Sequence, residues 1–316
     1  MSEAWNEIKI TVPVEYADTA AAITNMTVPY GIYIEDYSAL EDETMQIAHI
    51  DLIDEDLLQK DRTKAVIHVY INPCENPREA VSFIEARLQT ENISYTVDTA
   101  ACAEEDWVNN WKQYFHPMPV GKRLLIRPLW IDDYDAQGRK VLSIEPGLAF
   151  GTGSHPTTRL CLETMENYVT GGEDVLDIGC GSGILSVAAL LFGASSAFGV
   201  DIDPLAVKTA VQNAAENGFE TPQFRAVQGD LSDRVTGQYD VILANIVADI
   251  VMRLNTQVTP FLKPGGVYIT GGIIDTREPE VLASFAENGF TVLERHESDG
   301  WLVFVCQKMG AASDCR

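Results

Sequence analysis

Apolar and polar residues alternate in four short stretches of the first hundred residues, and helical spacing replaces the alternation in two others. Alternation predicts strands with one buried face, and apolar residues three and four apart predict amphipathic helices. The predicted order is strand, helix, strand, strand, helix, strand, which is the split βαβ or ferredoxin-like pattern. The predicted strands cover residues 8–12, 31–37, 65–71 and 93–97, and the predicted helices cover residues 15–25 and a stretch beginning at Pro77. We therefore expect a small α+β domain over residues 1–100.

From Glu173 onward the pattern changes to short apolar strands that alternate with amphipathic helices, which is typical of a doubly wound α/β sheet. The predicted strands cover residues 175–178, 197–201, 239–244 and 267–270, and the predicted helices cover residues 184–192, 204–217, a stretch ending near 262, and 278–288. Residues 290–295 and 301–305 are joined by a short polar turn, which predicts an antiparallel hairpin at the end of the sheet. We expect a Rossmann-like α/β domain over residues 119–316.

Three aromatic side chains lie at helical spacing between these two regions. Trp107, Trp111 and Phe115 are four residues apart, so a helix would place all three rings on one face. The stripe indicates either a face that docks against one of the domains or an interdomain hinge that also contacts substrate. We predict a linker helix over residues 101–118.

A candidate hairpin precedes the doubly wound region. Residues 124–130 and 140–144 have strand-like composition, and the turn-forming residues 135–138 lie between them. Turn residues between two strand patterns favour antiparallel pairing, so we expect these two strands to form a hairpin.

The net charge of the 316-residue chain is −25, and most of it lies in the first third. Residues 1–110 hold 22 Asp and Glu against 6 Lys and Arg, a net of −16, whereas residues 111–316 hold 25 against 16, a net of −9. A surface that binds nucleic-acid phosphates needs a local excess of Lys and Arg, so the composition argues against such a surface. The acidic excess serves either solubility or the attraction of a basic partner.

Six cysteines are scattered without a C-x-x-C pair or a His at metal-ligand spacing, so neither a metal site nor a disulfide framework is expected. The N-terminal residues lack the pattern of a signal peptide, and no apolar stretch reaches the ~18–20 residues that span a bilayer. We expect a cytoplasmic protein.

The most informative motif is a glycine-rich turn between a predicted strand and a predicted helix, Asp177-Ile178-Gly179-Cys180-Gly181-Ser182-Gly183. Glycines at such a turn allow the backbone to approach a bound nucleotide closely. A dinucleotide fingerprint has the spacing G-x-G-x-x-G, whereas this turn has G-x-G-x-G preceded by a carboxylate that suits an ammonium group better than a pyrophosphate. Asp201 ends the next strand, where a carboxylate can accept hydrogen bonds from both ribose hydroxyls. The two acids together predict an adenosyl amino acid as ligand.

These motifs resemble those of the class I S-adenosylmethionine-dependent methyltransferases over roughly residues 155–308. The resemblance implies S-adenosylmethionine as cofactor and a seven-stranded sheet with a reversed last strand. Three further features narrow it: the segment 145–158, the tetrapeptide Asn245-Ile246-Val247-Ala248, and the acidic N-terminal domain. With them, nearly the whole chain resembles the PrmA family of ribosomal-protein methyltransferases.

The resemblance implies a substrate and a role for each domain. The family methylates lysine ε-amino groups and the N-terminal α-amino group of the stalk-base protein, number eleven of the large ribosomal subunit. Its small N-terminal domain recognises that protein, and the linker helix allows several orientations. We expect a monomer with no direct nucleic-acid or membrane contact.

Asn245 is the predicted catalytic residue. Methyl transfer is an in-line displacement at a sulfonium carbon, so the protein must chiefly hold a neutral amine about 3–3.5 Å from the methyl group. The Asn245 side-chain carbonyl could accept an amine N–H and orient its lone pair without adding charge. Capping of the following helix is the alternative or additional role for this side chain. The residues after Asn245 depart from the Asn-Pro-Pro-aromatic sequence of amide and base methyltransferases, which favours a flexible amine over a stacked planar nitrogen.

Further site residues follow from the resemblance. The expected cofactor contacts are Thr158, Gly179, Asp201, Asn245, Asp177 and Gly181. Phe150 is expected to cover the cofactor. His155 could orient the amine or its leaving proton, or have a structural role before Pro156. Asp230 matches the acid that contacts adenine N6 in many class I enzymes, or is a solvated turn residue.

Two other functions remain open from the sequence alone. One is methylation of a small molecule or of rRNA, which the acidic N-terminal domain disfavours in the case of RNA. The other is a non-catalytic ribosome-assembly factor that retained the fold, which the presence of Asp177, Asp201 and Asn245 disfavours.

Overall fold

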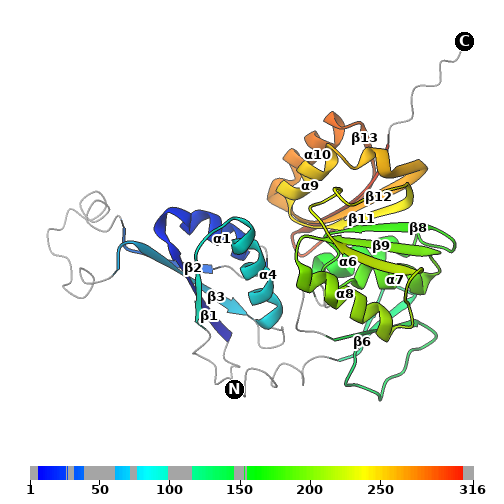
Figure 1. The fold of residues 1–316 in the computed structure, drawn as a ribbon, viewed down its shortest axis with the longest axis horizontal. Coiled ribbons are helices and arrows are strands. Elements are labelled where there is room, and N and C mark those ends of the chain that lie inside the picture. Colours follow the sequence, from blue (N-terminus) through cyan, green and yellow to red (C-terminus); the bar gives the residue numbers. More distant parts are fainter. Residues whose placement is uncertain are drawn as a thin grey trace, which may run out of the picture. The chain divides into compact units, whose positions relative to one another are not determined.

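The computed structural model describes residues 6–25, 27, 32–38, 61–71, 77–98, 116–145, 153 and 155–308. These residues belong to two compact units, one within residues 1–115 and one within residues 116–316 (Figure 1). The predicted linker helix falls almost wholly outside the described residues, as do Trp107, Trp111 and Phe115, and Met118 already belongs to a strand of the second unit. The predicted helix and domain boundaries therefore remain predictions.

The first unit is a four-stranded antiparallel sheet that shares one core with two helices. Its elements are β1 (Asn6–Pro13), a 3₁₀ turn (Val14–Tyr16), α1 (Ala17–Asn25), β2 (Ile32–Asp36), β3 (Lys64–Ile71), α4 (Pro77–Thr90) and β4 (Thr96–Asp98). Alternate residues of β1 and β3, such as Ile10 and Ile67, are buried in one cluster with Ile84 and Leu88 of α4. The strand order β2-β3-β1-β4 confirms the predicted ferredoxin-like pattern.

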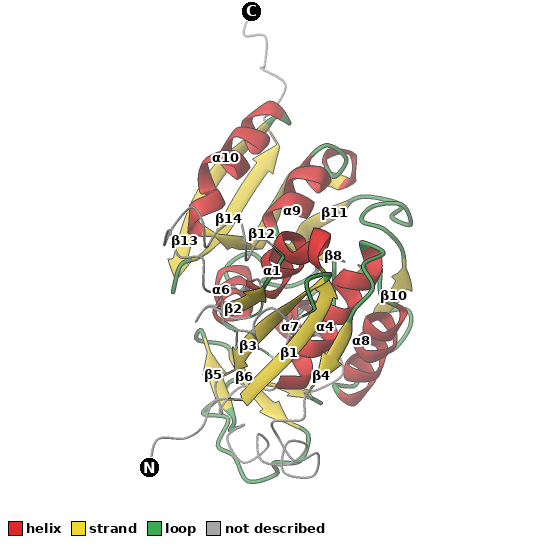
Figure 2. Cartoon of the chain, turned by 90° about the vertical axis from the view of Figure 1, so that its left-hand side faces the viewer, coloured by secondary structure: helices red, strands yellow, loops and turns green. Residues whose placement is uncertain are grey.

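The second unit contains a seven-stranded sheet with helices on both faces (Figures 1 and 2). Its strands are β8 (Asp174–Ile178), β9 (Ser196–Asp201), β10 (Phe224–Gln228), β11 (Tyr239–Asn245), β12 (Leu262–Ile274), β13 (Phe290–Ser298) and β14 (Trp301–Lys308). One face packs against α6 (Pro156–Met165), α7 (Ile184–Phe192) and α8 (Pro204–Glu216), and the other against α9 (Ala248–Asn255) and α10 (Glu278–Glu287). Two 3₁₀ turns, Thr259–Phe261 and Asp275–Arg277, complete it.

The strand order is β10-β9-β8-β11-β12-β14-β13, and β14 runs antiparallel to both of its neighbours. The predicted α/β class, the terminal hairpin and the reversed last strand are thereby confirmed. The strand β10 and the helix α6 have no counterpart in the elements predicted from the sequence. Helix α6 begins where His155 caps it and Pro156 occupies its first turn, which is the favoured place for a proline in a helix.

The prediction that residues 124–130 and 140–144 form a hairpin is wrong. The strands β6 (Leu124–Pro128) and β7 (Lys140–Ile144) pair in parallel, and the antiparallel partner of β6 is β5 (Met118–Val120). A turn does form near Gln137, whose N–H donates to Asp135, but it reverses the loop between the strands instead of joining them. Turn residues indicate that the chain reverses locally, but they do not determine whether the two flanking strands pair in parallel or antiparallel.

Arg123 fastens this small three-stranded sheet to the large one. Its guanidinium donates to the backbone carbonyls of Glu166 and Val169 at 2.7 and 2.8 Å, after the end of α6, and to that of Phe192 at 2.9 Å, at the end of α7. The guanidinium also lies 4.3 Å from the centroid of the Phe192 ring. One cation thus satisfies carbonyl groups left unpaired beyond two helix ends and fixes β6 beside them.

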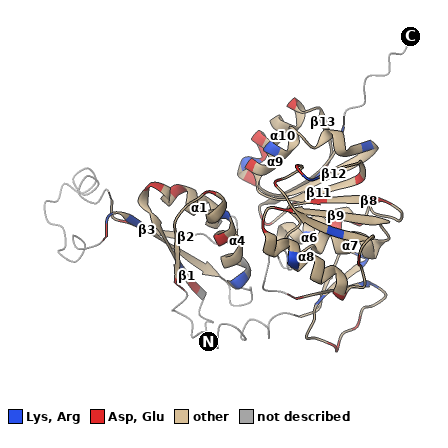
Figure 3. Ribbon diagram, in the orientation of Figure 1, with Lys and Arg blue, Asp and Glu red and all other residues tan. Residues whose placement is uncertain are grey.

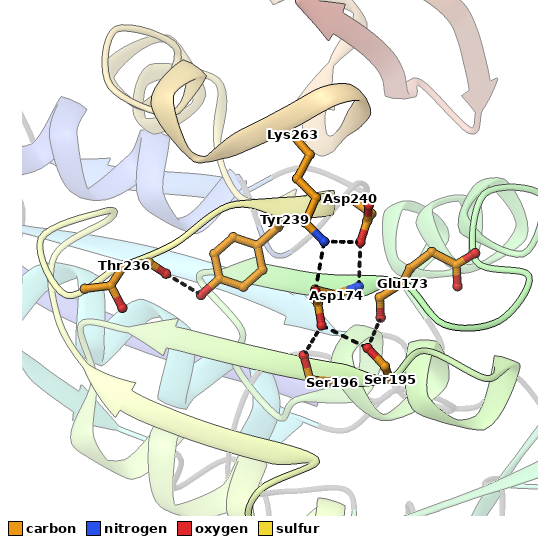
Figure 4. Close-up of polar contacts among 8 residues, drawn as sticks. All are labelled: Glu173, Asp174, Ser195, Ser196, Thr236, Tyr239, Asp240 and Lys263. Carbon is orange, nitrogen blue, oxygen red and sulfur yellow. Dashed lines mark hydrogen bonds and ion pairs between the residues drawn. The ribbon is translucent and has the colours of Figure 1, made fainter.

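A polar network joins the strands at their amino ends (Figure 4). The Lys263 ammonium on β12 lies 2.9 Å from a carboxylate oxygen of Asp174 on β8 and 2.7 Å from one of Asp240 on β11. The other Asp174 oxygen accepts from the hydroxyls of Ser195 and Ser196. These contacts, led by the one with Lys263, hold the pKa of Asp174 below its usual range. The network therefore stabilises this end of the sheet, opposite to the end that carries Asp177 and Asn245.

Replacing Lys263 with Met should lower the free energy of unfolding by about 1 kcal/mol near neutral pH, because two partly exposed ion pairs are lost. Since the folded-state pKa of Asp174 is depressed, its contribution is present above the unfolded-state pKa and is lost as pH falls through the folded-state value. The difference between the variant and the wild type should shrink below about pH 4. Urea unfolding monitored by circular dichroism measures it, with Lys208→Met as the exposed-lysine control. An equal loss in both variants would contradict this prediction.

Candidate active site

The predicted site residues converge on the carboxyl ends of three neighbouring strands. Asp177 lies near the end of β8, and Asp201 and Asn245 are the last residues of β9 and β11. The strand order reverses between β8 and β11, since β9 and β10 continue to one side and β12 to the other. Open α/β sheets bind ligands at such a switch point, outside the carboxyl ends of the strands.

The glycine-rich turn is held by backbone hydrogen bonds to β9. The Gly179 N–H donates to the Val200 carbonyl at 2.8 Å, and the Gly181 N–H donates to a carboxylate oxygen of Asp201 at 2.8 Å. Gly179 has a φ of +73°, and a Cβ there would overlap the side chain of Ile246. The turn therefore requires glycine at this position both for its conformation and for the close approach of the β11–α9 loop.

Asp177 is a buried carboxylate with an incomplete set of partners. One oxygen accepts from the Ser186 N–H at 3.2 Å and from the Ser186 hydroxyl at 2.7 Å, while Oδ1 has no hydrogen-bond partner among the described residues. Its side chain is 1% exposed, and this burial raises the pKa of Asp177 to about 7. An orphaned carboxylate oxygen beside a nucleotide-type turn fits the ammonium group of S-adenosylmethionine.

Asp201 connects the turn to the start of α8. Its second oxygen accepts from the Asp203 N–H at 3.0 Å, and the carboxylate is half-buried. A carboxylate oxygen can accept more than one hydrogen bond, so these contacts are compatible with the predicted binding of ribose hydroxyls. The apolar side chains of Ile202 and Leu205 are 40% and 43% exposed beside it, which suits contact with a nucleobase. Sequence reasoning did not single out these two residues.

Asn245 belongs to a hydrogen-bond network that sequence reasoning missed. Its Oδ1 accepts from the Thr157 hydroxyl at 2.9 Å, and its Nδ2 donates to the Thr158 hydroxyl at 3.3 Å. Thr157 in turn accepts from the Gly272 N–H at 2.7 Å, within β12. The capping role considered for Asn245 is wrong, because the N-cap of α9 is Val247 and no side chain caps that helix. The adjacent pair Thr157-Thr158 was the sequence signal for this network.

His155 is the N-cap of α6. Its Nδ1 accepts from the Thr157 N–H at 3.3 Å, and its ring lies edge-on to the Trp301 ring with centroids 4.8 Å apart. Burial lowers the pKa of His155 to about 4, so the ring is neutral at physiological pH. The structural role considered for His155 is thus observed, and its predicted catalytic role stays a prediction.

The described contacts do not bring two other predicted site residues into this group. The carboxylate of Asp230 is half-exposed and forms an ion pair with Arg253 on α9. This ion pair is compatible with the predicted adenine contact of Asp230, because the second carboxylate oxygen can still accept a hydrogen bond. Phe150 lies outside the described residues.

Among the described residues, no group of three or more His, Cys, Asp or Glu side chains could hold a metal ion. None of the described helices is long and apolar enough to span a membrane. The described cysteines Cys161, Cys180 and Cys306 are buried free thiols.

The fold and the site define a class I S-adenosylmethionine-dependent methyltransferase, as the switch-point turn, the two acids and the reversed last strand indicate. A family model described as ribosomal protein L11 methyltransferase (PrmA) matches residues 4–309. The chain belongs to this family, as predicted from the sequence.

Individual relatives agree with the family match. A ribosomal protein L11 methyltransferase from Lachnospira eligens is 36% identical over 312 residues, covering 94% of this chain and 97% of the relative. One from Caldanaerobacter subterraneus is also 36% identical, covering 97% and 99%. The crystal structure of the ribosomal protein L11 methylase from Lactobacillus delbrueckii is 31% identical with a TM-score of 0.59, covering 62% of this chain and all of that chain. These matches confirm the enzyme class and the cofactor.

Asp177→Asn should change the pH dependence of stability. Because the folded-state pKa of Asp177 is raised, the ligand-free wild type loses stability as pH rises from about 4, the unfolded-state value, to about 7. The uncharged variant lacks this loss, so its stability relative to the wild type should increase over the same interval. Chemical unfolding at several pH values measures the effect, and Asp174→Asn on the same strand should destabilise instead. A constant difference across the interval would contradict the assigned burial of the charge.

Proposed function

We propose that this methyltransferase modifies amines of ribosomal protein L11, namely lysine ε-amino groups and the N-terminal α-amino group, and that Asn245 orients the amine. The observation that carries the proposal is the fixed Asn245 amide at the end of β11, beside the glycine turn, in a chain whose relatives are named for L11 methylation. When bound, S-adenosylmethionine supplies an electrophilic methyl group on a sulfonium centre.

Asn245 is suited to hold a neutral amine. Thr157 donates to its Oδ1 and Thr158 accepts from its Nδ2, so the amide cannot rotate without losing both bonds. The second lone pair of Oδ1 can then accept an amine N–H and direct the nitrogen lone pair toward the methyl group. Because Asn245 is uncharged, it does not favour the protonated amine, which has no lone pair to react. A carboxylate at this position would do so.

The two acids would bind different parts of the cofactor. Asp177 faces the ammonium group with its unpartnered oxygen, and Asp201 accepts the ribose hydroxyls, with Ile202 and Leu205 beside the base. The described contacts of His155 support a positioning role, since it holds the backbone of Thr157, which in turn holds Asn245. Any direct contact between His155 and the amine remains part of the proposal.

The first unit is proposed to recognise the protein substrate. Its described residues hold 10 Asp and Glu against 5 Lys and Arg, a net of −5 (Figure 3). The rest of the −16 of residues 1–110 lies in sequence that the structure does not describe. An acidic domain would attract a substrate whose target amines are positive until they lose a proton, and this attraction weakens with salt.

Asp201→Ala should weaken S-adenosylmethionine binding by about 1.5–3 kcal/mol, roughly 10- to 150-fold, because the charged acceptor of the ribose hydroxyls is lost. Isothermal titration calorimetry measures the affinity. Asp203→Ala is the matched control: it removes the N-cap of α8, whose carboxylate accepts from the Leu205 N–H, but no predicted cofactor contact. Unchanged affinity in Asp201→Ala, or an equal loss in the control, would reject the assignment.

Removal of residues 1–115 should abolish methylation of intact L11 while leaving cofactor binding, because the second unit has its own core and contains every predicted cofactor contact. The measurement is transfer of labelled methyl groups to purified L11 and, separately, to rRNA. A short lysine peptide serves as control, since it needs no recognition domain and should be methylated equally slowly by both forms. Full kcat/KM of the truncated form on L11 would show that the first unit is not the recognition module, and label on RNA alone would overturn the proposed substrate.

A further inference from the structure

Helix α8 presents an unusual buried face to the rest of the second unit. Most of its buried residues are small, namely Ala206, Thr209, Ala210 and Ala214, yet the face also contains Asn213, which is 3% exposed. A buried amide is costly unless its hydrogen bonds are satisfied, so its partners indicate why it is there.

The Asn213 side chain bridges two segments that are distant in sequence. Its Nδ2 donates to the Ser182 carbonyl of the glycine turn at 2.9 Å, and its Oδ1 accepts from the Glu145 N–H, directly after β7, at 3.3 Å. The amide therefore donates to the glycine turn and accepts from the backbone directly after the last strand of the small three-stranded sheet.

The Ser182 carbonyl controls the second half of the turn. The first half is held by β9, through the Val200 carbonyl and the Asp201 carboxylate. The Ser182 carbonyl belongs to the peptide that ends at Gly183, and the Gly183 N–H donates to the Cys180 carbonyl at 2.8 Å. A bond to the Ser182 carbonyl fixes the plane of this peptide, because the peptide unit is planar. The approach of α8 is close enough that a Cβ on Gly183 would lie 2.9 Å from the Cβ of Ala210.

We propose that Asn213 is a positioning residue for S-adenosylmethionine: it fixes the Ser182–Gly183 peptide of the cofactor turn and ties that turn to the end of β7. This inference rests on the proposed placement of the cofactor at the turn. The tie matters because the chain after Glu145 leads to Thr157 and Thr158, which form hydrogen bonds with Asn245, and to His155, which accepts from the Thr157 N–H. Asn213 thus connects the glycine turn, where the cofactor is proposed to bind, with the end of β7, which precedes Thr157 and Thr158 in the chain.

Asn217 provides a matched control on the same helix. It lies one turn later, and its amide pairs with Ser143 of β7, accepting from the N–H at 2.8 Å and donating to the carbonyl at 2.6 Å. It also donates to the backbone carbonyl of Asn213, a bond that does not involve the Asn213 side chain. Both asparagines anchor the β7 segment, and Asn213 in addition donates to the glycine turn.

The experiment compares three variants of the full-length chain with the wild type. Asn213→Leu removes both side-chain bonds, Asn213→Asp keeps the acceptor for Glu145 but loses the donor to Ser182, and Asn217→Leu removes the matched anchor. For each, S-adenosylmethionine affinity is measured by calorimetry and stability by thermal unfolding. We expect a roughly tenfold weaker affinity in both Asn213 variants. We expect Asn217→Leu to lower the melting temperature by as much as Asn213→Leu does. The cofactor affinity of Asn217→Leu should stay within about twofold of the wild type.

The outcomes separate positioning from general loosening. Wild-type affinity in Asn213→Asp, or an affinity loss in Asn217→Leu equal to that in Asn213→Leu, would overturn the inference. Should Asn213→Leu fail to fold, the isosteric Asn213→Asp decides by the same criterion. In kinetic assays on L11, the KM for the cofactor should rise in Asn213→Asp with kcat nearly unchanged. If Asp201→Ala also bound normally, the placement of the cofactor would fail; if only the Asn213 variants bound normally, this inference alone would fail.

Discussion

The site depends on a close approach of three backbone segments at the carboxyl edge of the large sheet. The Ile246 side chain occupies the space where a Cβ on Gly179 would lie, and the Ile246 carbonyl would lie 2.5 Å from a Cβ on Gly272. The Ile246 N–H donates to the Gly271 carbonyl at 3.2 Å. Glycine in two of these segments lets the third pass between them, since any side chain would force them apart. The cofactor turn, the catalytic strand end and β12 are therefore placed relative to one another by contact.

This placement explains how a neutral amide can be held without flexibility. Gly272 donates to Thr157, Thr157 donates to Asn245, and Asn245 donates to Thr158. Each group donates a hydrogen bond to the next group in the series. All donors in the network therefore point the same way, and the Asn245 amide has a single orientation. Asp177 differs from the neutral Asn245 amide, because it is a carboxylate that is buried in the absence of a cationic ligand. The ligand-free enzyme is less stable for it above about pH 4, and the ammonium group proposed to bind there would remove that penalty.

The sequence predicted periodic elements well and non-local pairing poorly. Helix 184–192 and the terminal hairpin agree with the structure because their patterns are local and long enough to be unambiguous. The predicted antiparallel pairing of β6 with β7 was wrong, because the strands pair in parallel and a turn motif does not specify the direction of pairing. Asp177, Asp201 and Asn245 could be assigned to one site because carboxyl ends of parallel strands share an edge. The partners Thr157, Ser186 and Asn213 could not, because their hydrogen bonds join residues up to 88 positions apart.

The residue after Asn245 connects this packing to the kind of nitrogen that is methylated. Amide and base methyltransferases of this class often carry the sequence Asn-Pro-Pro-aromatic at this point, and the aromatic ring suits stacking on a planar nitrogen. Here Ile246 is 7% exposed. Its side chain packs against Gly179 and its backbone against Gly272. It therefore presents no apolar surface on which a planar group could stack. In the proposed mechanism, recognition of the nitrogen then falls to hydrogen bonding by Asn245, which requires an N–H and a lone pair but no ring, and a neutral alkyl amine has both.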